Sequence, residues 1–204
     1  MKTYTLRERP ELEPDFERLA REGWPRFMRQ RDELGCGQYW PALFTDFAEW
    51  QVALCGEFDR VVAVGHTIPF VWDGQPSTLP PSVAAIMANA VQARAVGRRP
   101  TALSAMAALV DARHRGQGVS RALLSAMTRI AGLHGLASFV APVRPTLKAA
   151  YPLCSMERYV RWTNDDGLQF DPWMRVHARM GEDSLRLRAN APAADLLIAA
   201  HEPI

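Results

Sequence analysis

Apolar positions in the first fifty residues follow a helical period. Residues 12–30 place Phe16, Leu19 and other apolar side chains on one face, and Pro25 is expected to break or end the first segment. Residues 38–50, rich in aromatic side chains and with Pro41 near the first turn, predict a second helix. The chain therefore begins with helical segments.

The period then changes to that of strands. Residues 51–55 and 60–72 are apolar and β-branched, and the turn between them predicts a hairpin. A helix is predicted over 82–96, because Ser82 suits the N-cap and Gly97 suits the position just past the end.

Residues 101–143 indicate a strand, a turn, a helix and a second strand. The run 101–110 is almost continuously apolar and reads as a strand buried on both faces. From Val119 to Ile130 the apolar positions return to helical spacing, and 137–143 is another apolar strand. A right-handed crossover between parallel strands follows, so the fold class is a mixed α/β sheet.

In the last quarter of the chain, the patterns that predict helices and strands are shorter. Residues 145–151 predict a helical turn, 157–162 a strand, and 171–181 a helix with Asp171 at its N-cap. Residues 195–200 suit either a last strand or a docked helix. We expect one domain spanning 1–204, because this length suits a single core.

Composition excludes several classes. The 204 residues carry a formal net charge of +2, which does not favour a nucleic-acid-binding protein. Three scattered cysteines indicate free thiols in a reducing cytoplasm, and the histidines lack the spacing of a metal site. The sequence shows no secretory signal and no stretch suited to crossing a membrane. We therefore expect a cytoplasmic protein that binds neither metal nor membrane.

The stretch DARHRGQG at 111–118 carries the clearest chemical signal. Two glycines and two arginines lie between a predicted strand and a predicted helix. The unpaired amides of a helix start, its dipole and nearby cations together suit a phosphate group. The P-loop pattern lacks its Lys-Ser or Lys-Thr pair, and Arg121 stands where the dinucleotide pattern GxGxxG needs its third glycine.

Arg113–Gly118 matches instead the pattern Arg/Gln-x-x-Gly-x-Gly/Ala, so this segment resembles the acetyl-CoA signature of the GNAT family of N-acetyltransferases. A register starting at Arg115 is the alternative. The resemblance covers 101–155, treats the helix at 82–96 as an insertion, and implies central parallel strands that splay apart around acetyl-CoA or another acyl-CoA. The implied cofactor-binding residues are Ala108, Leu109, Val110, Arg113, Arg115, Gly116, Gln117, Gly118, Val119, Ser120 and Arg121.

The family resemblance also implies direct acyl transfer from the thioester to an amine. Tyr151 is the candidate acid that protonates the departing thiolate. Asp46 and Glu49 are the candidate bases, with Glu57 in the following turn as a further alternative. The usual carboxylate is missing, because residues 101–110 contain no Asp or Glu. The expected activity is N-acetylation of a small molecule by a chain that could be a homodimer; the alternative is a non-catalytic acyl-CoA-binding domain of the same fold.

Overall fold

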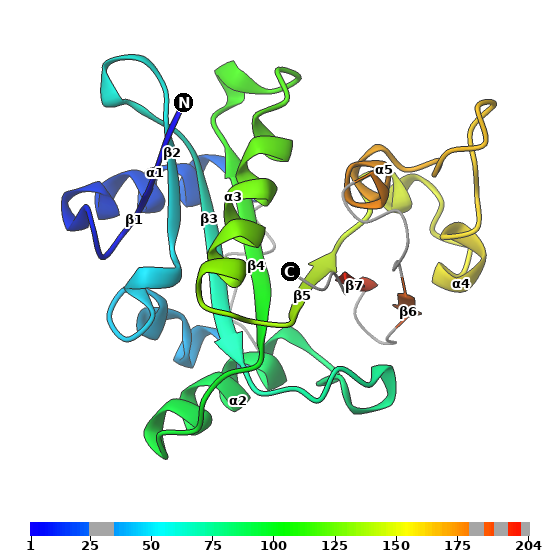
Figure 1. The fold of residues 1–204 in the computed structure, drawn as a ribbon. Helices are drawn as coiled ribbons and strands as arrows, with labels where there is room; N and C mark the ends of the chain where they lie inside the picture. Colours follow the sequence, from blue (N-terminus) through cyan, green and yellow to red (C-terminus); the bar gives the residue numbers. More distant parts are fainter. Residues whose placement is uncertain (25–34, 180–185, 190–195, 201–204) are drawn as a thin grey trace.

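The computed structural model describes residues 1–24, 35–179, 186–189 and 196–200, and it has a mixed β-sheet at its centre (Figure 1). The strand order is β1-β2-β3-β4-β5-β7-β6. β4 and β5 are the parallel pair, whereas all other neighbours are antiparallel. The strands are β1 Lys2–Thr5, β2 Val52–Cys55, β3 Val61–Phe70, β4 Ala102–Val110, β5 Ser138–Val143, β6 Arg186–Ala189 and β7 Leu196–Ala200.

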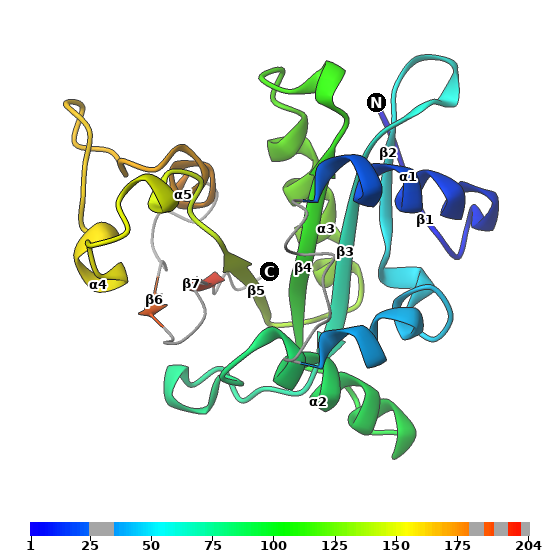
Figure 2. The same ribbon diagram turned by 180° about the vertical axis from the view of Figure 1, so that it is seen from behind.

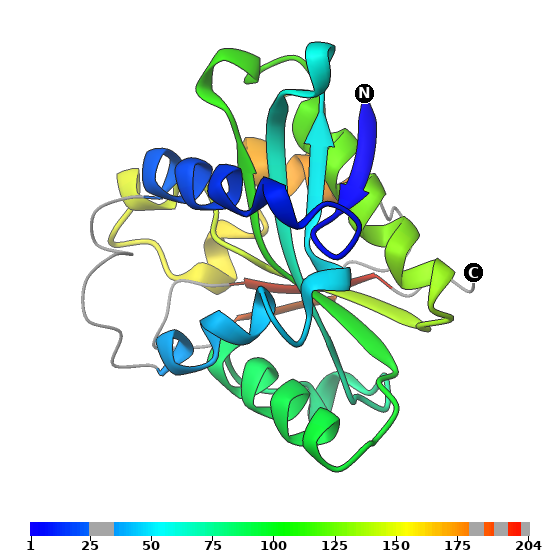
Figure 3. The same ribbon diagram turned by 90° about the vertical axis from the view of Figure 1, so that its left-hand side faces the viewer.

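Helices cover both faces of the sheet. Figure 3 shows α1 and α2 on one face and α3 on the other, and Figure 2 shows α1 lying across β3 and β4. The crossover from β4 through α3 to the parallel strand β5 is the one that the sequence predicts. The helices are α1 Glu13–Gly23, α2 Val83–Ala95, α3 Val119–Leu133, α4 Met156–Tyr159 and α5 Pro172–Ala178.

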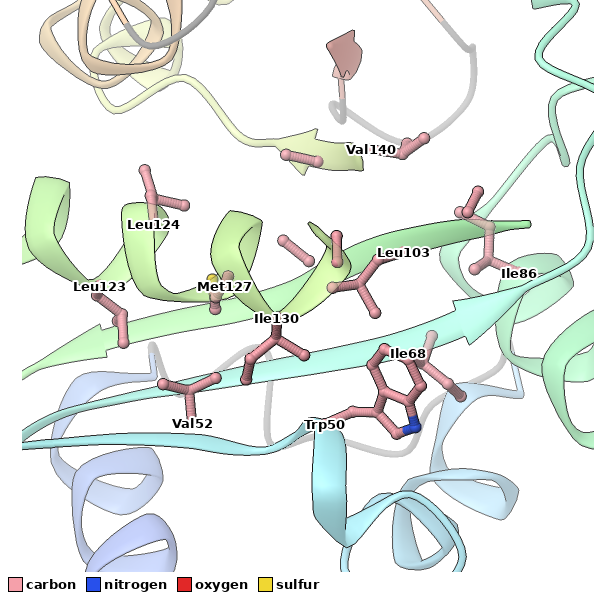
Figure 4. Packing of buried hydrophobic residues seen from close by; sticks show 14 of the residues in the cluster. Trp50, Val52, Ile68, Ile86, Leu103, Leu123, Leu124, Met127, Ile130 and Val140 are labelled. Atoms are coloured by element: carbon pink, nitrogen blue, oxygen red, sulfur yellow. The ribbon is translucent and has the colours of Figure 1, made fainter. Parts of the chain in front are cut away.

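The main core lies between α3 and the sheet. Leu123, Met127 and Ile130 project from α3 onto β3 and β4 (Figure 4). Gly65 of β3 makes this close approach possible, because a Cβ at that position would overlap the tip of Met127. α1 packs on the opposite face through a second cluster that contains Phe16 and Leu19.

Several predicted elements are confirmed. The hairpin strands and the two strands of the crossover are present as β2, β3, β4 and β5. In α2 the Ser82 hydroxyl accepts a hydrogen bond from the Ala85 amide at 3.2 Å, and Gly97 follows with a φ of 66°. Asp171 caps α5 as expected. At the chain end, the strand alternative is the one observed, as β7.

The predicted helix over 38–50 is wrong. The chain forms three separate 3₁₀ turns there, Cys36–Gln38, Trp40–Leu43 and Ala48–Trp50. Pro41 suits the first turn of Trp40–Leu43, where its missing N–H has no helical partner to lose. Phe47, with a φ of −120° and a ψ of 24°, leaves the helical conformation and separates the second turn from the third. Short turns also allow aromatic side chains to face the core from several directions.

Other differences concern short elements. Residues 157–162 were expected as a strand, but Ser155 caps the helical turn α4 by accepting from the Arg158 amide at 3.4 Å. The strand β1 was not predicted, because four residues give too little alternation to recognise. The predicted helices over 12–30 and 171–181 continue into residues 25–34 and 180–185, which lie outside the described residues.

Candidate functional site

The parallel strands β4 and β5 separate after a short paired stretch. Their register covers only Ala102–Ser104 of β4 against Ser138–Val140 of β5. Beyond this point β4 continues to Val110 while pairing with β3, and β5 pairs with β7. The side of β4 that faces β5 is therefore an open edge over residues 105–110, within the part of the chain that the structure describes. This is the splay that the family resemblance implies.

A β-bulge lies at the start of this open edge. The register of β4 against β3 passes from Ala105↔Thr67 to Ala107↔His66, so Met106 is the extra residue. Beyond the bulge the Asp111 amide donates to the Val62 carbonyl at 2.9 Å.

Along a strand, the backbone amide and carbonyl groups of successive residues point alternately to one side and the other. The bond from Asp111 to Val62 therefore shows which residues of β4 have their backbone groups on the open edge. This alternation turns the amide and carbonyl of Ala108 and Val110 towards the edge and those of Leu109 towards β3. Ala108 and Val110 are thus available to a ligand there, whereas Leu109 pairs with Val64.

The predicted phosphate loop connects β4 to α3 at the same end as the open edge (Figure 1). Gly116 and Gly118 have φ values of 75° and 76°, which L-residues with a side chain adopt rarely. Gly118 is the N-cap of α3, and its carbonyl accepts the first helical bond, from Ala122. The amides of Val119, Ser120 and Arg121 in the first turn consequently have no partner within the helix.

The Asp111 carboxylate holds this loop in place by accepting hydrogen bonds from it. The buried carboxylate accepts from the Arg113 amide at 3.0 Å and from both the Nε and the Nη2 of Arg113, at 3.0 and 2.7 Å. Arg18 of α1 reaches the same carboxylate at 3.4 Å. These contacts, the hydrogen bonds from Arg113 foremost, hold the pKa of Asp111 well below its ordinary value. The Arg113 guanidinium, although largely exposed, is therefore held against the loop by the Asp111 carboxylate.

The remaining loop side chains point outwards. Arg115 and Arg121 are exposed and have no ion pair within the described part of the chain. Gln117 donates from its side chain to the Arg113 carbonyl at 3.1 Å. Two guanidinium groups and a set of helix-start amides are thus available for an anion, as the sequence predicts for a phosphate.

Tyr151, the candidate acid, follows β5 after a 3₁₀ turn. Its side chain is 37% exposed, and its ring lies edge-on to Trp162 with centroids 4.9 Å apart. Within the described chain its hydroxyl has no hydrogen-bond partner. The structure thus leaves this group free for a ligand on the β5 side of the splay, and its catalytic role stays a prediction.

The two candidate bases lie elsewhere. Asp46 forms an ion pair with Arg94 at 3.5 Å, and Glu49 accepts from the Trp50 indole at 3.1 Å. Glu49 lines a cavity of about 480 Å³ together with Pro100 and Leu136, which precede β4 and β5. The phosphate loop lies at the far end of β4, about 30 Å away along the strand. The structure does not bring these carboxylates together with the loop or with Tyr151.

Sequence reasoning missed two buried polar side chains near the splay. His66 of β3 is 1% exposed and Ser104 of β4 is fully buried, and neither His66 Nε2 nor Ser104 Oγ has a hydrogen-bond partner among the residues that the structure describes. A histidine inside an otherwise apolar strand was the available signal. In the described residues no group of three or more His, Cys, Asp or Glu side chains is arranged to hold a metal. None of the helices within the described ranges has the length and hydrophobicity that crossing a bilayer requires.

Comparisons with known proteins indicate what this chain is similar to. No family model matches the sequence. The chain is 29% identical over 194 residues to the arginine N-acetyltransferase avaD of Aspergillus versicolor, an alignment that covers 87% of this chain and 64% of that protein. The chain thus spans less than two thirds of the length of this curated relative.

Two solved structures share the fold over nearly the whole chain. The loading GNATL domain of CurA from Lyngbya majuscula has a TM-score of 0.71 at 18% identity, covering 98% of this chain and 96% of that one. The GphF GNAT-like decarboxylase in complex with isobutyryl-CoA has a TM-score of 0.69 at 17% identity, covering 98% and 99%. These likenesses confirm the fold that the family resemblance implies and identify the chain as a protein of the GNAT fold.

Proposed function

We propose that the protein is an acyl-CoA-dependent N-acyltransferase that moves acetyl from acetyl-CoA to an amine of a small molecule. One observation carries the proposal: the open edge of β4 ends at a glycine-rich helix start with unpaired amides. An extended pantetheine chain needs hydrogen-bonding groups along its length, and a pyrophosphate needs an anion site at one end. The arginine N-acetyltransferase relative supports the choice of an amine acceptor.

The proposed binding follows the strand. Pantetheine amides pair with the backbone of Ala108 and Val110, and the pyrophosphate lies on the amides of residues 119–121. Arg115 and Arg121 supply formal positive charge. Arg94, Arg98 and Arg99 line the cavity at the opposite end of β4 and so take no part in binding the CoA phosphates.

The proposed reaction is direct transfer. The lone pair of a neutral amine attacks the thioester carbonyl carbon, the C–S bond breaks, the nitrogen loses a proton and the thiolate gains one. Tyr151 is the proposed proton donor to the thiolate. Its hydroxyl has no hydrogen-bond partner within the described chain, so no existing bond has to break when it donates.

A thermal titration with acetyl-CoA tests the binding step. A ligand of the native state stabilises by mass action, by about 2.7 kcal/mol at one hundred times its dissociation constant. For a chain of this size we expect a rise in melting temperature of roughly 5–10 °C. A melting temperature that stays constant up to millimolar acetyl-CoA contradicts both transfer and simple acyl-CoA binding.

Thiol release then separates an enzyme from a binding domain. The missing carboxylate on β4 is the observation that favours a non-catalytic acyl-CoA binder as the second candidate. Purified protein, acetyl-CoA and one of L-arginine, agmatine or L-2,4-diaminobutyrate are mixed, and free CoA is followed with a thiol reagent. Amine-dependent release supports the transferase, and binding without release from any amine supports the second candidate.

Replacing Tyr151 by Phe tests the proposed acid. We expect turnover to fall about 10- to 100-fold, because the thiolate loses its proton donor. The acetyl-CoA dissociation constant should change less than twofold, since the ring and its contacts are kept. Trp162→Phe serves as a control for the aromatic packing around this ring. Turnover of Tyr151→Phe equal to that of the parent protein removes Tyr151 from the mechanism.

A further inference from the structure

The orphaned atoms His66 Nε2 and Ser104 Oγ are the starting point. A buried polar atom without a partner destabilises the fold by roughly 1–3 kcal/mol, and native proteins contain few of them. Two such atoms on neighbouring strands beside the splay therefore require an explanation. Burial also lowers the pKa of His66 to about 3, so its ring is neutral.

Both side chains lie on the same face of the sheet. Gly65 faces α3, because a Cβ there would meet Met127, and the next residue, His66, must face the other way. Its ring centroid is 5.3 Å from that of Phe16 in α1. Ser104 lies opposite Ile68, which is two residues beyond His66 along β3, so Ser104 faces the α1 side as well.

Hydrogen bonds determine which ring nitrogen of His66 carries the proton. The Gln51 side-chain amide donates at 2.8 Å to the carbonyls of Phe47 and Thr67, which fixes its nitrogen on that side. Its oxygen then lies 3.2 Å from His66 Nδ1. Because an amide oxygen only accepts, Nδ1 must hold the hydrogen. Nε2 consequently has a lone pair that no group within the described residues uses.

The His66 side chain, which carries this lone pair, lies near the point where β4 and β5 separate. His66 lies opposite Ala107, immediately beyond the bulged residue Met106, where the open edge of β4 begins. Ser104 is the last residue of β4 that pairs with β5. Residues 105, 107 and 108 are alanines, so the strand here is lined by small side chains. The polar side chains of His66 and Ser104, on the sheet face that α1 covers, thus lie close to the part of β4 that borders the proposed acyl-CoA cleft.

We propose that His66 Nε2 accepts a hydrogen bond from the N–H of the acceptor amine and thereby positions its nitrogen for attack, with the Ser104 hydroxyl as a second contact on the same face. This inference rests on the proposed function. Half-buried Trp40 and Phe44, whose ring centroids lie 5.1 and 5.6 Å from that of His66, enclose the site. A neutral ring in this setting orients an amine that is already uncharged and takes no proton from it.

Two substitutions test the role of Nε2. His66→Asn places an amide nitrogen near the position of Nδ1, so the bond to Gln51 is kept while the acceptor at Nε2 is lost. His66→Gln places an amide group near Nε2 and can restore an acceptor there. We expect kcat/KM for the amine to fall about 10- to 100-fold in His66→Asn, the size expected for one buried hydrogen bond. His66→Gln should recover part of that loss, and neither should change the acetyl-CoA dissociation constant more than twofold.

The outcomes separate the two proposals. Acetyl-CoA stabilisation and amine-dependent thiol release in the parent protein, with full kcat/KM in a folded His66→Asn variant, overturn the role of His66 and leave the proposed function standing. No acetyl-CoA stabilisation in the parent protein overturns the proposed function itself. Phe16→Leu changes the packing of the ring without removing a polar group, and a loss of kcat/KM equal to that of His66→Asn would also overturn the role.

Nitrogen NMR gives a test that needs no variant. Protein labelled with ¹⁵N-histidine should show His66 as a neutral ring protonated at Nδ1. Adding free CoA together with the preferred amine forms a complex that cannot react, and the Nε2 resonance should then shift as its lone pair accepts a bond. A proton on Nε2 in the free protein, or an Nε2 resonance that does not move at saturating amine, contradicts the inference.

Discussion

Replacing Gly118 by Asp is expected to remove most of the affinity for acetyl-CoA, about 100-fold or more. Two effects combine. A residue with a Cβ is strained at the observed φ of 76°, by about 1–2 kcal/mol. The new carboxylate would also lie at the start of α3, where the proposed pyrophosphate binds, and two like charges a few ångströms apart repel by about 1–3 kcal/mol near a protein surface. Isothermal titration with acetyl-CoA measures the change.

Matched variants separate charge from backbone strain. Gly118→Asn has nearly the same shape as Gly118→Asp without the charge, and Asn tolerates left-handed φ, so we expect a loss of only about tenfold. Gly135→Asp introduces similar strain at a φ of 65° beyond the other end of α3, where a Cβ also meets nothing within 4 Å. It should lower stability without changing affinity. Equal affinities for Gly118→Asp and Gly118→Asn would contradict the pyrophosphate position.

The crossover was predictable because local signals agree there. Apolar runs, helical spacing from Val119 and the glycines of the loop all favour one strand–turn–helix–strand arrangement. The splay followed from the family resemblance. It could not have been derived from residue pattern alone, because it depends on where β4 and β5 stop pairing with each other, while β4 continues along β3 and β5 along β7 on its other edge. Strand partners far apart in sequence leave no local signal.

The helix predicted over 38–50 was wrong because its side-chain pattern and its backbone conformation disagree. Its aromatic side chains match a helical face, yet the backbone leaves the helical conformation at Phe47. The assignment of Asp46 and Glu49 as bases depended on that helix, and the three turns direct both carboxylates to arginines or to Trp50 instead. Their role remains a prediction without geometric support.

The site was predictable in part. Gly116 and Gly118 have the left-handed backbone that a glycine pattern implies. Arg113 could not be assigned from sequence, because a guanidinium binds a phosphate and a carboxylate equally well. In the structure it binds the Asp111 carboxylate. His66 needed tertiary information, since an isolated histidine in an apolar strand is more often an inert core residue than a ligand. Only its orphaned Nε2 and its position beside the bulge distinguish it.

Replacing Asp171 by Ala is expected to destabilise the protein by about 3–4 kcal/mol, because several buried donors lose their acceptor together. One carboxylate oxygen accepts from the Tyr159 hydroxyl at 2.9 Å and from the Leu147 amide at 2.8 Å. The other caps α5 by accepting from the amides of Trp173 and Met174 at 3.0 and 3.3 Å. Asp171 itself is 1% exposed, so water cannot replace these bonds. Urea unfolding monitored by tryptophan fluorescence measures the loss.

Tyr159→Phe removes only one of these bonds and is the matched control. We expect it to lose about 1 kcal/mol, with the Asp171 cap and the Leu147 contact kept. The difference between the two variants reports how firmly Asp171 ties the segment after β5 to α5. That segment carries Tyr151, so Asp171→Ala should also lower turnover more than it lowers acetyl-CoA affinity. If the two variants unfold at the same urea concentration, the carboxylate contributes no more than its bond to Tyr159, and Tyr151 is held by its other contacts, such as those to Trp162 and Phe170.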